Sequence, residues 1–180
     1  KIAASFLKER PVWVRCNLNL ASKEEILAAL KKQQVSAEQV EGFDSMLALS
    51  EYDHMESLDA FQKGWIQVQD ISSALVGELA APEKGSYIID VCAAPGGKSL
   101  HLADKMEGTG CVEARDLTYQ KVALIEENAS RMGALNIKAV QWDATEFDPE
   151  SENKADLVIA DLPCSGLGII GRKPDIKYHT

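Results

Sequence analysis

Cysteine is scarce in this sequence, and its spacing argues against two classes of small protein. The 180 residues hold four cysteines, which form no CxxC pair and have no neighbouring histidine at zinc-ligand spacing. We therefore expect neither a disulfide framework nor a bound metal. Free cysteines are typical of a reducing compartment, so the sequence predicts a cytoplasmic protein. The four are Cys16, Cys92, Cys111 and Cys164.

Long apolar runs and a leader segment are also missing. The longest stretch without Asp, Glu, Lys or Arg runs from Leu162 to Gly171, whereas a membrane span needs roughly 20 apolar residues. Position 1 is Lys rather than Met, and no basic and apolar leader with a cleavage site follows it. We expect no membrane partner and no secretory signal, and we expect the chain to be a piece of a longer protein.

Basic residues are fewer than acidic ones. The 19 Lys and Arg against 28 Asp and Glu give a net charge of -9 and a pI near 4.9, which at first sight argues against a nucleic-acid partner. The bases gather near the two ends, however. Residues 1–15 hold four bases and one acid, and the segment after Pro163 holds Arg172, Lys173 and Lys177 against one acid. The net charge is therefore a weak guide to partners.

The first third of the chain contains one clear strand and helix. Alternation over Pro11–Leu18 predicts a strand. Ser22 and Glu25 have the spacing of a capping box, and apolar spacing extends the helix to about Gln33. The stretch Val35–Phe61 has no clear period, and we interpret it as irregular.

From Tyr87 onward strands alternate with helices. The strands expected are Tyr87–Val91, Cys111–Ala114, Ile137–Gln141 and Asp156–Ala160, and a helix is expected over about 118–132. Short apolar strands that alternate with helices predict a parallel α/β sheet of the doubly wound type. In such sheets, ligands bind at the carboxyl ends of the strands.

A turn of small residues, CAAPGGKS at Cys92–Ser99, follows the first of these strands. Small residues let backbone N–H groups approach a ligand closely, and a helix N-terminus favours negative charge. Three interpretations compete. A Walker A phosphate loop fits the GKS end but needs a glycine where Cys92 stands. A dinucleotide fingerprint lacks its GxGxxG, and a nucleoside site, as for S-adenosylmethionine, is the third.

Three acids favour the nucleoside site. Asp116, Asp143 and Asp161 follow three successive strands, and Asp116 lies near the roughly 20-residue distance at which a carboxylate meets ribose hydroxyls. These acids would repel a chain of phosphates unless a metal intervened. Adenosylmethionine instead offers hydroxyls, an amine and a cationic sulfonium with its ammonium group. The acids therefore predict a crevice for this methyl donor.

Cys164 follows closely after Asp161 in the segment DLPCSG. A lone cysteine is more often a small buried hydrophobe than a nucleophile. Beside a methyl donor, however, a thiolate can add to carbon 6 of a pyrimidine, so that carbon 5 attacks the methyl group before a base removes the proton and the thiolate leaves. The target base would have to leave its stack. Taken alone, the residues make Cys164 a candidate nucleophile.

The motifs resemble a known family. CAAPGGKS at 92–99, EARDLTYQK at 113–121, WDA around Asp143 and DLPCSGLGIIGRKPDIK at 161–177 are similar to the Sun/Fmu branch of the bacterial RNA cytosine-5 methyltransferases, in the NOL/NOP/Sun family. That branch modifies small-subunit ribosomal RNA. WVRCN at 13–17 and GWIQVQDISSAL at 64–75 are similar to the region before its catalytic domain. The resemblance covers nearly the whole chain.

The resemblance implies a site and corrects the role of Cys164. It places the ribose on Asp116, the adenine near Asp143 and the methionine end near Asp161. The family's nucleophile is a second cysteine in a Thr-Cys motif, which these 180 residues lack, so Cys164 assists product release and the chain alone is expected to be inactive. The loop residues expected to bind adenosylmethionine are Cys92, Ala93, Ala94, Pro95, Gly96, Gly97 and Lys98.

The resemblance also implies a domain organisation. We expect residues 1–62 to form a small α+β portion that resembles an RNA-recognition motif, with a linker. Residues 63–180 are expected to form the first half of a Rossmann-like class I methyltransferase domain with about four parallel strands. Ribosomal RNA is the expected partner, with Arg172, Lys173 and Lys177 as candidates for phosphate contacts. Two alternatives stay open, a nucleotide triphosphatase and a non-catalytic RNA-binding module.

Overall fold

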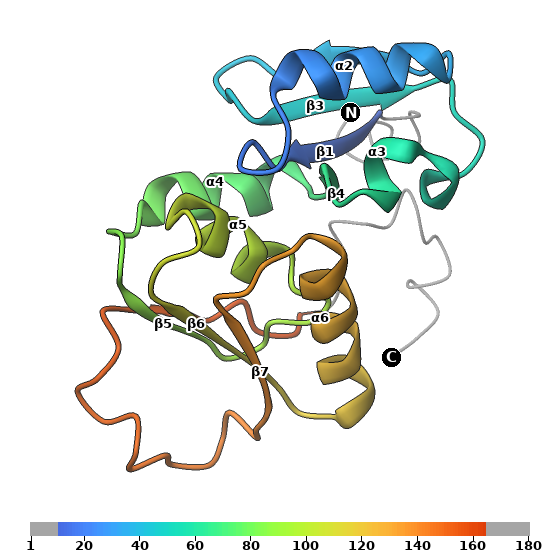
Figure 1. The fold of residues 1–180 in the computed structure, drawn as a ribbon. Coiled ribbons are helices and arrows are strands. Elements are labelled where there is room, and N and C mark those ends of the chain that lie inside the picture. The colour runs from blue at the N-terminus through green and yellow to red at the C-terminus, as the bar shows by residue number, and fades with distance from the viewer. Residues whose placement is uncertain (1–10, 165–180) are drawn as a thin grey trace, which may run out of the picture.

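The structure is a computed structural model that describes residues 11–164. It contains two four-stranded sheets, one formed by the N-terminal part of the chain and one by the C-terminal part. Figure 1 shows α2 on the outer face of the N-terminal sheet, whereas α4 and α5 lie between the two sheets. Two layers of helices and two sheets therefore alternate through the molecule.

The N-terminal sheet is entirely antiparallel, in the order β2-β3-β1-β4. With α2 after β1 and short helical turns before β4, this is the split βαβ connectivity, as expected for a portion that resembles an RNA-recognition motif. Its elements are β1 (Val12–Cys16), α2 (Lys23–Lys32), β2 (Ser36–Gln39), β3 (Met46–Ser50), η1 (Met55–Ser57), α3 (Asp59–Gln62) and β4 (Ile66–Val68).

The predicted strand and helix near the start of the chain are confirmed as β1 and α2. Ser22 caps α2, because its side chain accepts from the N–H of Glu25 and the Glu25 carboxylate accepts from the N–H of Ser22. The interpretation of Val35–Phe61 as irregular is wrong. It contains β2, β3, η1 and most of α3. Of these, β2 is an edge strand of sequence SAEQ whose pairing with β3, rather than any apolar period, forms the strand.

The C-terminal sheet is parallel, in the order β7-β6-β5-β8. The chain runs from β5 to β7 on one side and returns to place β8 on the other, so the Rossmann-like parallel sheet predicted from the sequence is confirmed. Its switch point lies between β5 and β8. The elements are α4 (Ile71–Ala80), β5 (Tyr87–Asp90), α5 (Gly97–Lys105), β6 (Cys111–Asp116), α6 (Tyr119–Arg131), β7 (Ile137–Gln141) and β8 (Leu157–Ile159).

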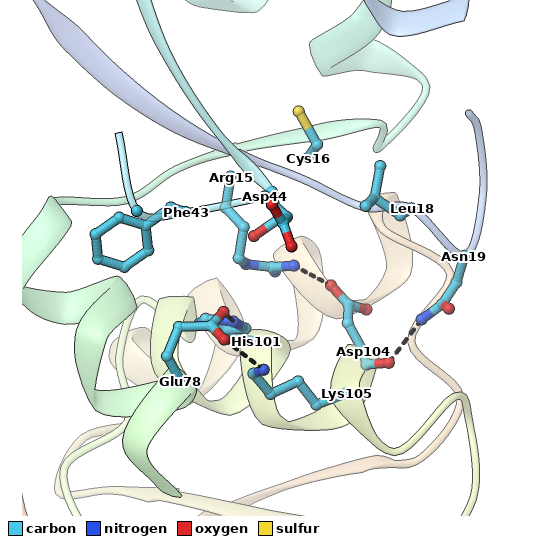
Figure 2. Close-up of a pocket in the computed structure, with 12 residues that line it drawn as sticks. Arg15, Cys16, Leu18, Asn19, Phe43, Asp44, Glu78, His101, Asp104 and Lys105 are labelled. Atoms are coloured by element: carbon cyan, nitrogen blue, oxygen red, sulfur yellow. Dashed lines mark hydrogen bonds and ion pairs between the residues drawn. The ribbon is translucent and has the colours of Figure 1, made fainter. Parts of the chain in front are cut away.

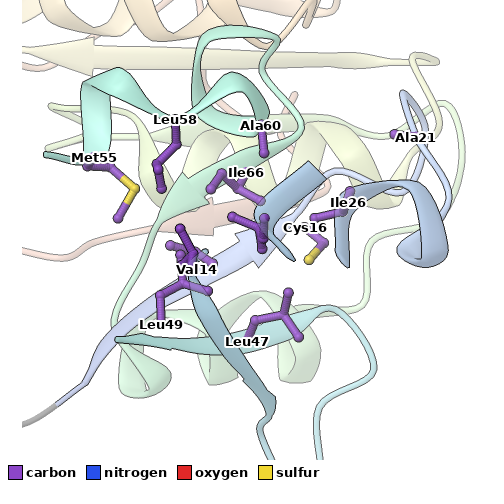
Figure 3. Packing of buried hydrophobic residues seen from close by; sticks show 12 residues of the cluster. Val14, Cys16, Ala21, Ile26, Leu47, Leu49, Met55, Leu58, Ala60 and Ile66 are labelled. Carbon is purple, nitrogen blue, oxygen red and sulfur yellow. The ribbon is translucent and has the colours of Figure 1, made fainter. Parts of the chain in front are cut away.

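Separate apolar clusters hold the two sheets to their helices. In the N-terminal part, Val14, Leu47 and Leu49 of the sheet pack with Ile26 and Leu30 of α2 (Figure 3). Burial of a large aliphatic side chain contributes about 1.5–3 kcal/mol. In the C-terminal part, α5 and α6 pack on one and the same face of the sheet, through Leu102 against Ile88 and Val112, and through Ile125 against Ala114.

The division after residue 62 stays a prediction. Sheet pairing is nevertheless informative, because β4 (Ile66–Val68) hydrogen-bonds to β1 and so belongs to the N-terminal sheet. Asp70 then caps α4 by accepting from the N–H of Ser72. In residues 11–164, no helix is long and apolar enough to cross a membrane.

Candidate functional site

The loop between β5 and α5, residues 91–96, lies at the carboxyl edge of the parallel sheet. Backbone hydrogen bonds hold it there: the N–H of Ala93 donates to the carbonyl of Arg115 in β6 at 2.8 Å, and the N–H of Gly96 donates to the carbonyl of Ala93 at 2.7 Å. Gly96 has a φ of 104°, which side chains rarely permit. The predicted turn of small residues is therefore a tight bend that leads directly into α5.

Asp116, the last residue of β6, holds this loop through its side chain. One carboxylate oxygen accepts from the N–H of Ala94 at 3.0 Å, and the other accepts from the N–H of Leu117 at 2.8 Å and pairs with the ammonium of Lys121 at 2.9 Å. Burial alone would raise the pKa of this carboxyl, but these partners outweigh burial and lower it. Asp116 is therefore ionised at neutral pH although it is only 3% exposed.

Asp161 faces the same loop from the other side of the switch point. It follows β8, and its carboxylate lies 2.6 Å from the ammonium of Lys98 in the first turn of α5. The Asp161 side chain is 60% exposed, so this ion pair contributes little to stability. The carboxylate thus stays accessible at the edge of the sheet where the sequence predicts a ligand.

Asp90 is a fourth carboxylate at this edge, and the sequence reasoning did not single it out. It ends β5, is 1% exposed, and accepts from the hydroxyl of Ser99 at 2.7 Å. Its other oxygen makes no hydrogen bond to any described residue. Burial raises the pKa of Asp90, against the effect of Ser99. An acid in the otherwise apolar run YIIDV was the signal that could have revealed it.

Asp143 follows β7, at the same sheet edge as Asp116. It is exposed, and its carboxylate accepts from both the N–H and the hydroxyl of Thr145, at 2.9 and 2.7 Å. These hydrogen bonds lower the pKa of Asp143. Its polar contacts to described residues stay inside its own turn, so the structure supports the position of Asp143 at the edge without joining it to the loop.

The two cysteines near this edge differ in environment. Cys92 is half-buried, and burial, together with the charge of Asp116, raises the pKa of its thiol. A thiol with a raised pKa is a poor nucleophile at neutral pH. Cys164 is exposed and is the last residue that the structure describes. The candidate RNA contacts Arg172, Lys173 and Lys177 lie outside the described residues.

The arrangement suits a ligand that carries hydroxyl groups and positive charge. Carboxylates from β5, β6 and β8 surround a loop of small residues, and carboxylates accept hydrogen bonds and attract cations. No group of three or more acidic, histidine or cysteine side chains within residues 11–164 is placed to hold a metal ion.

Comparison with protein families identifies the chain. Residues 78–180, more than half of it, match the family described as 16S rRNA methyltransferase RsmB/F. The chain belongs to this family. The resemblance stated from the CAAPGGKS and DLPCSG motifs is thereby confirmed.

Curated relatives extend the similarity to the N-terminal sheet. The chain is 45% identical over 119 residues to the probable ribosomal RNA small subunit methyltransferase B of Bacillus subtilis, which covers 66% of this chain and 27% of that protein. It is 34% identical over 171 residues to the ribosomal RNA small subunit methyltransferase B of Proteus mirabilis, with 93% of this chain and 40% of that protein covered. The chain thus spans at most about two fifths of these relatives.

Solved structures agree on the fold. A methyltransferase homologue from Pyrococcus horikoshii superposes with a TM-score of 0.82 at 29% identity, covering 98% of this chain and 58% of that one. The crystal structure of NSun6 from the same organism has a TM-score of 0.82 at 21% identity and covers 91% of this chain. Both sheets therefore belong to a shared architecture, since these matches cover nearly the whole chain.

Proposed function

We propose that this chain is the cofactor-binding part of an S-adenosylmethionine-dependent enzyme that forms 5-methylcytosine in small-subunit ribosomal RNA. The observation that carries the proposal is the buried Asp116 carboxylate, which accepts a hydrogen bond from the loop between β5 and α5. Family membership gives the reaction class. Because the chain spans only part of its relatives, the activity, the cofactor and the RNA target belong to this proposal.

The residues present fit adenosylmethionine. Asp116 would accept hydrogen bonds from the ribose hydroxyls, as carboxylates after the second strand do in nucleoside sites. The accessible carboxylate of Asp161 and the unpaired oxygen of Asp90 suit the cationic methionine end. Asp143 would lie near the adenine. When bound, the cofactor supplies an electrophilic methyl group.

The residues of the loop between β5 and α5 would line one side of this site. Residues without large side chains let the backbone approach the ligand, and Gly96 permits the bend that leads into α5. Lys98 lies within the same segment and partners Asp161 in this structure. The residues proposed to contact the cofactor remain Cys92, Ala93, Ala94, Pro95, Gly96, Gly97 and Lys98, with Asp116, Asp143 and Asp161.

Cytosine methylation at carbon 5 requires a thiolate that first adds to carbon 6. By the family resemblance this thiolate comes from a Thr-Cys motif, and the 180 residues contain no Thr-Cys pair. Cys164 would then assist release of the methylated base. We expect the 180-residue chain alone to bind the cofactor and not to methylate RNA.

The proposal extends to the setting of the reaction. Ribosomal RNA in the cytoplasm is the proposed partner, and Arg172, Lys173 and Lys177 are proposed to contact its phosphates. Residues 1–62 are proposed as a separate N-terminal portion and residues 63–180 as the start of the methyltransferase domain, with β4 contributed to the N-terminal sheet.

The decisive experiment is methyl transfer by the full-length protein from radiolabelled adenosylmethionine. Small-subunit ribosomal RNA and transfer RNA are offered separately, and the product nucleoside is identified after digestion. We expect labelled 5-methylcytosine in the ribosomal RNA alone. Label in transfer RNA alone, or in a nucleoside other than 5-methylcytosine, would refute the proposed substrate or reaction.

A further inference from the structure

Helices α5 and α6 run from the carboxyl edge of the parallel sheet, where the cofactor is proposed to bind, to the N-terminal sheet. Helix α5 begins at Gly97, directly after the β5–α5 loop, and α6 begins after Asp116, with Thr118 as its cap. In Figure 1 the N-terminal sheet lies beyond α5, on the side away from the parallel sheet. Each helix carries, in its last turn, a side chain that contacts the N-terminal part of the chain: Asp104 in α5 and Arg131 in α6.

Arg15 of β1 forms the contact with α5. It is 1% exposed, its guanidinium pairs with the carboxylate of Asp104, and its Nε donates to the side-chain oxygen of Gln69 at 2.9 Å. Figure 2 shows the guanidinium pointing from β1 toward Asp104. Asn19 adds a hydrogen bond of 2.8 Å from its side chain to the carbonyl of Asp104. Because removal of one partner leaves a buried charge uncompensated, this pair is sensitive to substitution.

Arg131 forms the contact between α6 and the sheet. Its guanidinium donates to the carbonyl of Phe61 at 2.8 Å and of Ile66 at 3.2 Å, and it lies over the Phe61 ring with 3.9 Å between the guanidinium carbon and the ring centroid. It also donates to the side-chain oxygen of Gln67 in β4. The last turns of α5 and α6 are thus held to the N-terminal part of the chain by arginine side chains that are buried or half-buried.

Arg15 of β1 and Gln67 of β4 lie on one particular face of the N-terminal sheet. Arg15 pairs in register with Met46 of β3 and with Gln67 of β4, so the three side chains form a row across the sheet. They are 1%, 0% and 6% exposed. Helix α2 packs on the opposite face through Ile26 and Leu30. In an RNA-recognition motif the face without helices carries aromatic side chains that stack on bases. Here the row that contains Arg15 is buried and has no aromatic residue, and Trp13, two residues before Arg15 on the same face of β1, is half-buried.

We propose that the N-terminal sheet supports the cofactor site through this face and does not read RNA with it, with Arg15 as a positioning residue that acts through Asp104 and α5 on the loop at residues 91–96. This inference rests on the proposed function, because the ligand of that loop is taken to be adenosylmethionine. The coupling is physical: a shift at the last turn of α5 moves its first turn, since a helix transmits displacement along its axis as a rigid element.

The test compares two affinities in the same variants of the full-length protein. Arg15→Lys keeps the positive charge, but a lysine ammonium lacks the planar guanidinium that contacts both Asp104 and Gln69. Asp104→Asn keeps the shape of the side chain and removes its charge. Affinity for adenosylmethionine is measured by calorimetry and affinity for small-subunit ribosomal RNA by filter binding. Both affinities are measured for variants whose circular dichroism spectrum shows native structure. Lys84→Met, which removes an exposed ion pair with Glu107, is the matched control.

We expect both variants to weaken adenosylmethionine binding about tenfold, within the range of ordinary coupling between sites, and to change RNA affinity less than about twofold. The double variant should lose no more affinity for adenosylmethionine than a single variant does, because the two residues act as one unit. Amide exchange over residues 97–105 should increase in the variants, and Lys84→Met should change neither affinity nor exchange.

Two results would overturn the inference. One is a loss of RNA affinity in Arg15→Lys with cofactor affinity unchanged, since the face would then read RNA. The other is cofactor affinity unchanged in both variants. A wild-type protein that binds no adenosylmethionine would instead refute the proposed function itself. If Arg15→Lys fails to fold, Asn19→Ala removes a contact to Asp104 from the exterior and should weaken cofactor binding about twofold to threefold, the effect of one modest hydrogen bond.

Discussion

The Asp116 carboxylate accepts a hydrogen bond of 3.0 Å from the N–H of Ala94, so the last residue of β6 fixes the loop that follows β5. One oxygen of the carboxylate thus orders the loop, while the other pairs with Lys121 and the N–H of Leu117. Asp116 links the shape of the loop to the charge of the site, and substitution should affect both.

Asp116→Asn should weaken adenosylmethionine binding by about tenfold to a hundredfold, because hydrogen bonds to charged groups contribute roughly 1.5–3 kcal/mol. The amide oxygen can still accept from Ala94, so the fold should be retained. Calorimetric titration measures the affinity, and Glu24→Gln on the exposed side of α2 is the control. Equal affinity in wild type and Asp116→Asn would contradict the ribose assignment.

His101 should make the protein acid-sensitive. The side chain is 3% exposed, and burial, with the charges of Arg15 and Lys105, lowers its pKa to about 3. An unfolded histidine titrates near pH ~6.5, so between about pH 6.5 and 3 the unfolded chain binds one more proton at this position. The free energy of unfolding should therefore fall with falling pH, by up to about 1.4 kcal/mol per unit.

Urea denaturation at pH 7, 6 and 5 measures this effect, and these values are chosen because they cross the expected window. His101→Gln should flatten the pH dependence relative to wild type, while other titrating groups contribute equally to both proteins. His54→Gln, at an exposed position, should retain the wild-type slope. Identical slopes in His101→Gln and wild type would show that His101 is not held neutral.

Gly77 in α4 should not tolerate a side chain. A Cβ at this position would lie 2.3 Å from Nδ1 of His101, and His101 is itself held with its Nε2 3.1 Å from the carboxylate of Glu78. Gly77→Ala should destabilise the protein by about 1–3 kcal/mol, as overpacking of a close contact does. Thermal unfolding compares it with Ser73→Ala on the same helix, and equal stability of the two variants would contradict this packing.

Cys164→Ala should impair product release without impairing cofactor binding. If Cys164 assists the departure of the methylated base, the full-length variant should retain RNA in a covalent complex after methyl transfer. A protein band of lower mobility on a denaturing gel, removed by ribonuclease, detects this complex. The companion variant Cys111→Ala alters a half-buried cysteine at the start of β6 and should leave no such band. Free release by Cys164→Ala would exclude the role.

Much of the sheet edge where the cofactor is proposed to bind could be predicted from the sequence, because its signals are local. Apolar runs indicated β5 through β8, and the small-residue turn and the acids after the strands indicated the edge where a ligand is proposed to bind. Asp90 was missed because it is a single acid in an otherwise apolar run, and its burial and its contact with Ser99 are visible only in the structure. β2 was missed because an edge strand with few apolar residues depends on its partner for its conformation.

The sequence by itself determined the fold class and the family and predicted the residues proposed to bind the cofactor, because periodicity, glycine turns and short motifs are properties of neighbouring residues. Only the tertiary structure decided what the N-terminal sheet contacts. Nothing near Arg15 in the sequence indicates that it pairs with Asp104, or that Arg131 reaches the carbonyls of Phe61 and Ile66. These contacts join residues far apart in the chain, and only the packing of two sheets against shared helices brings them together.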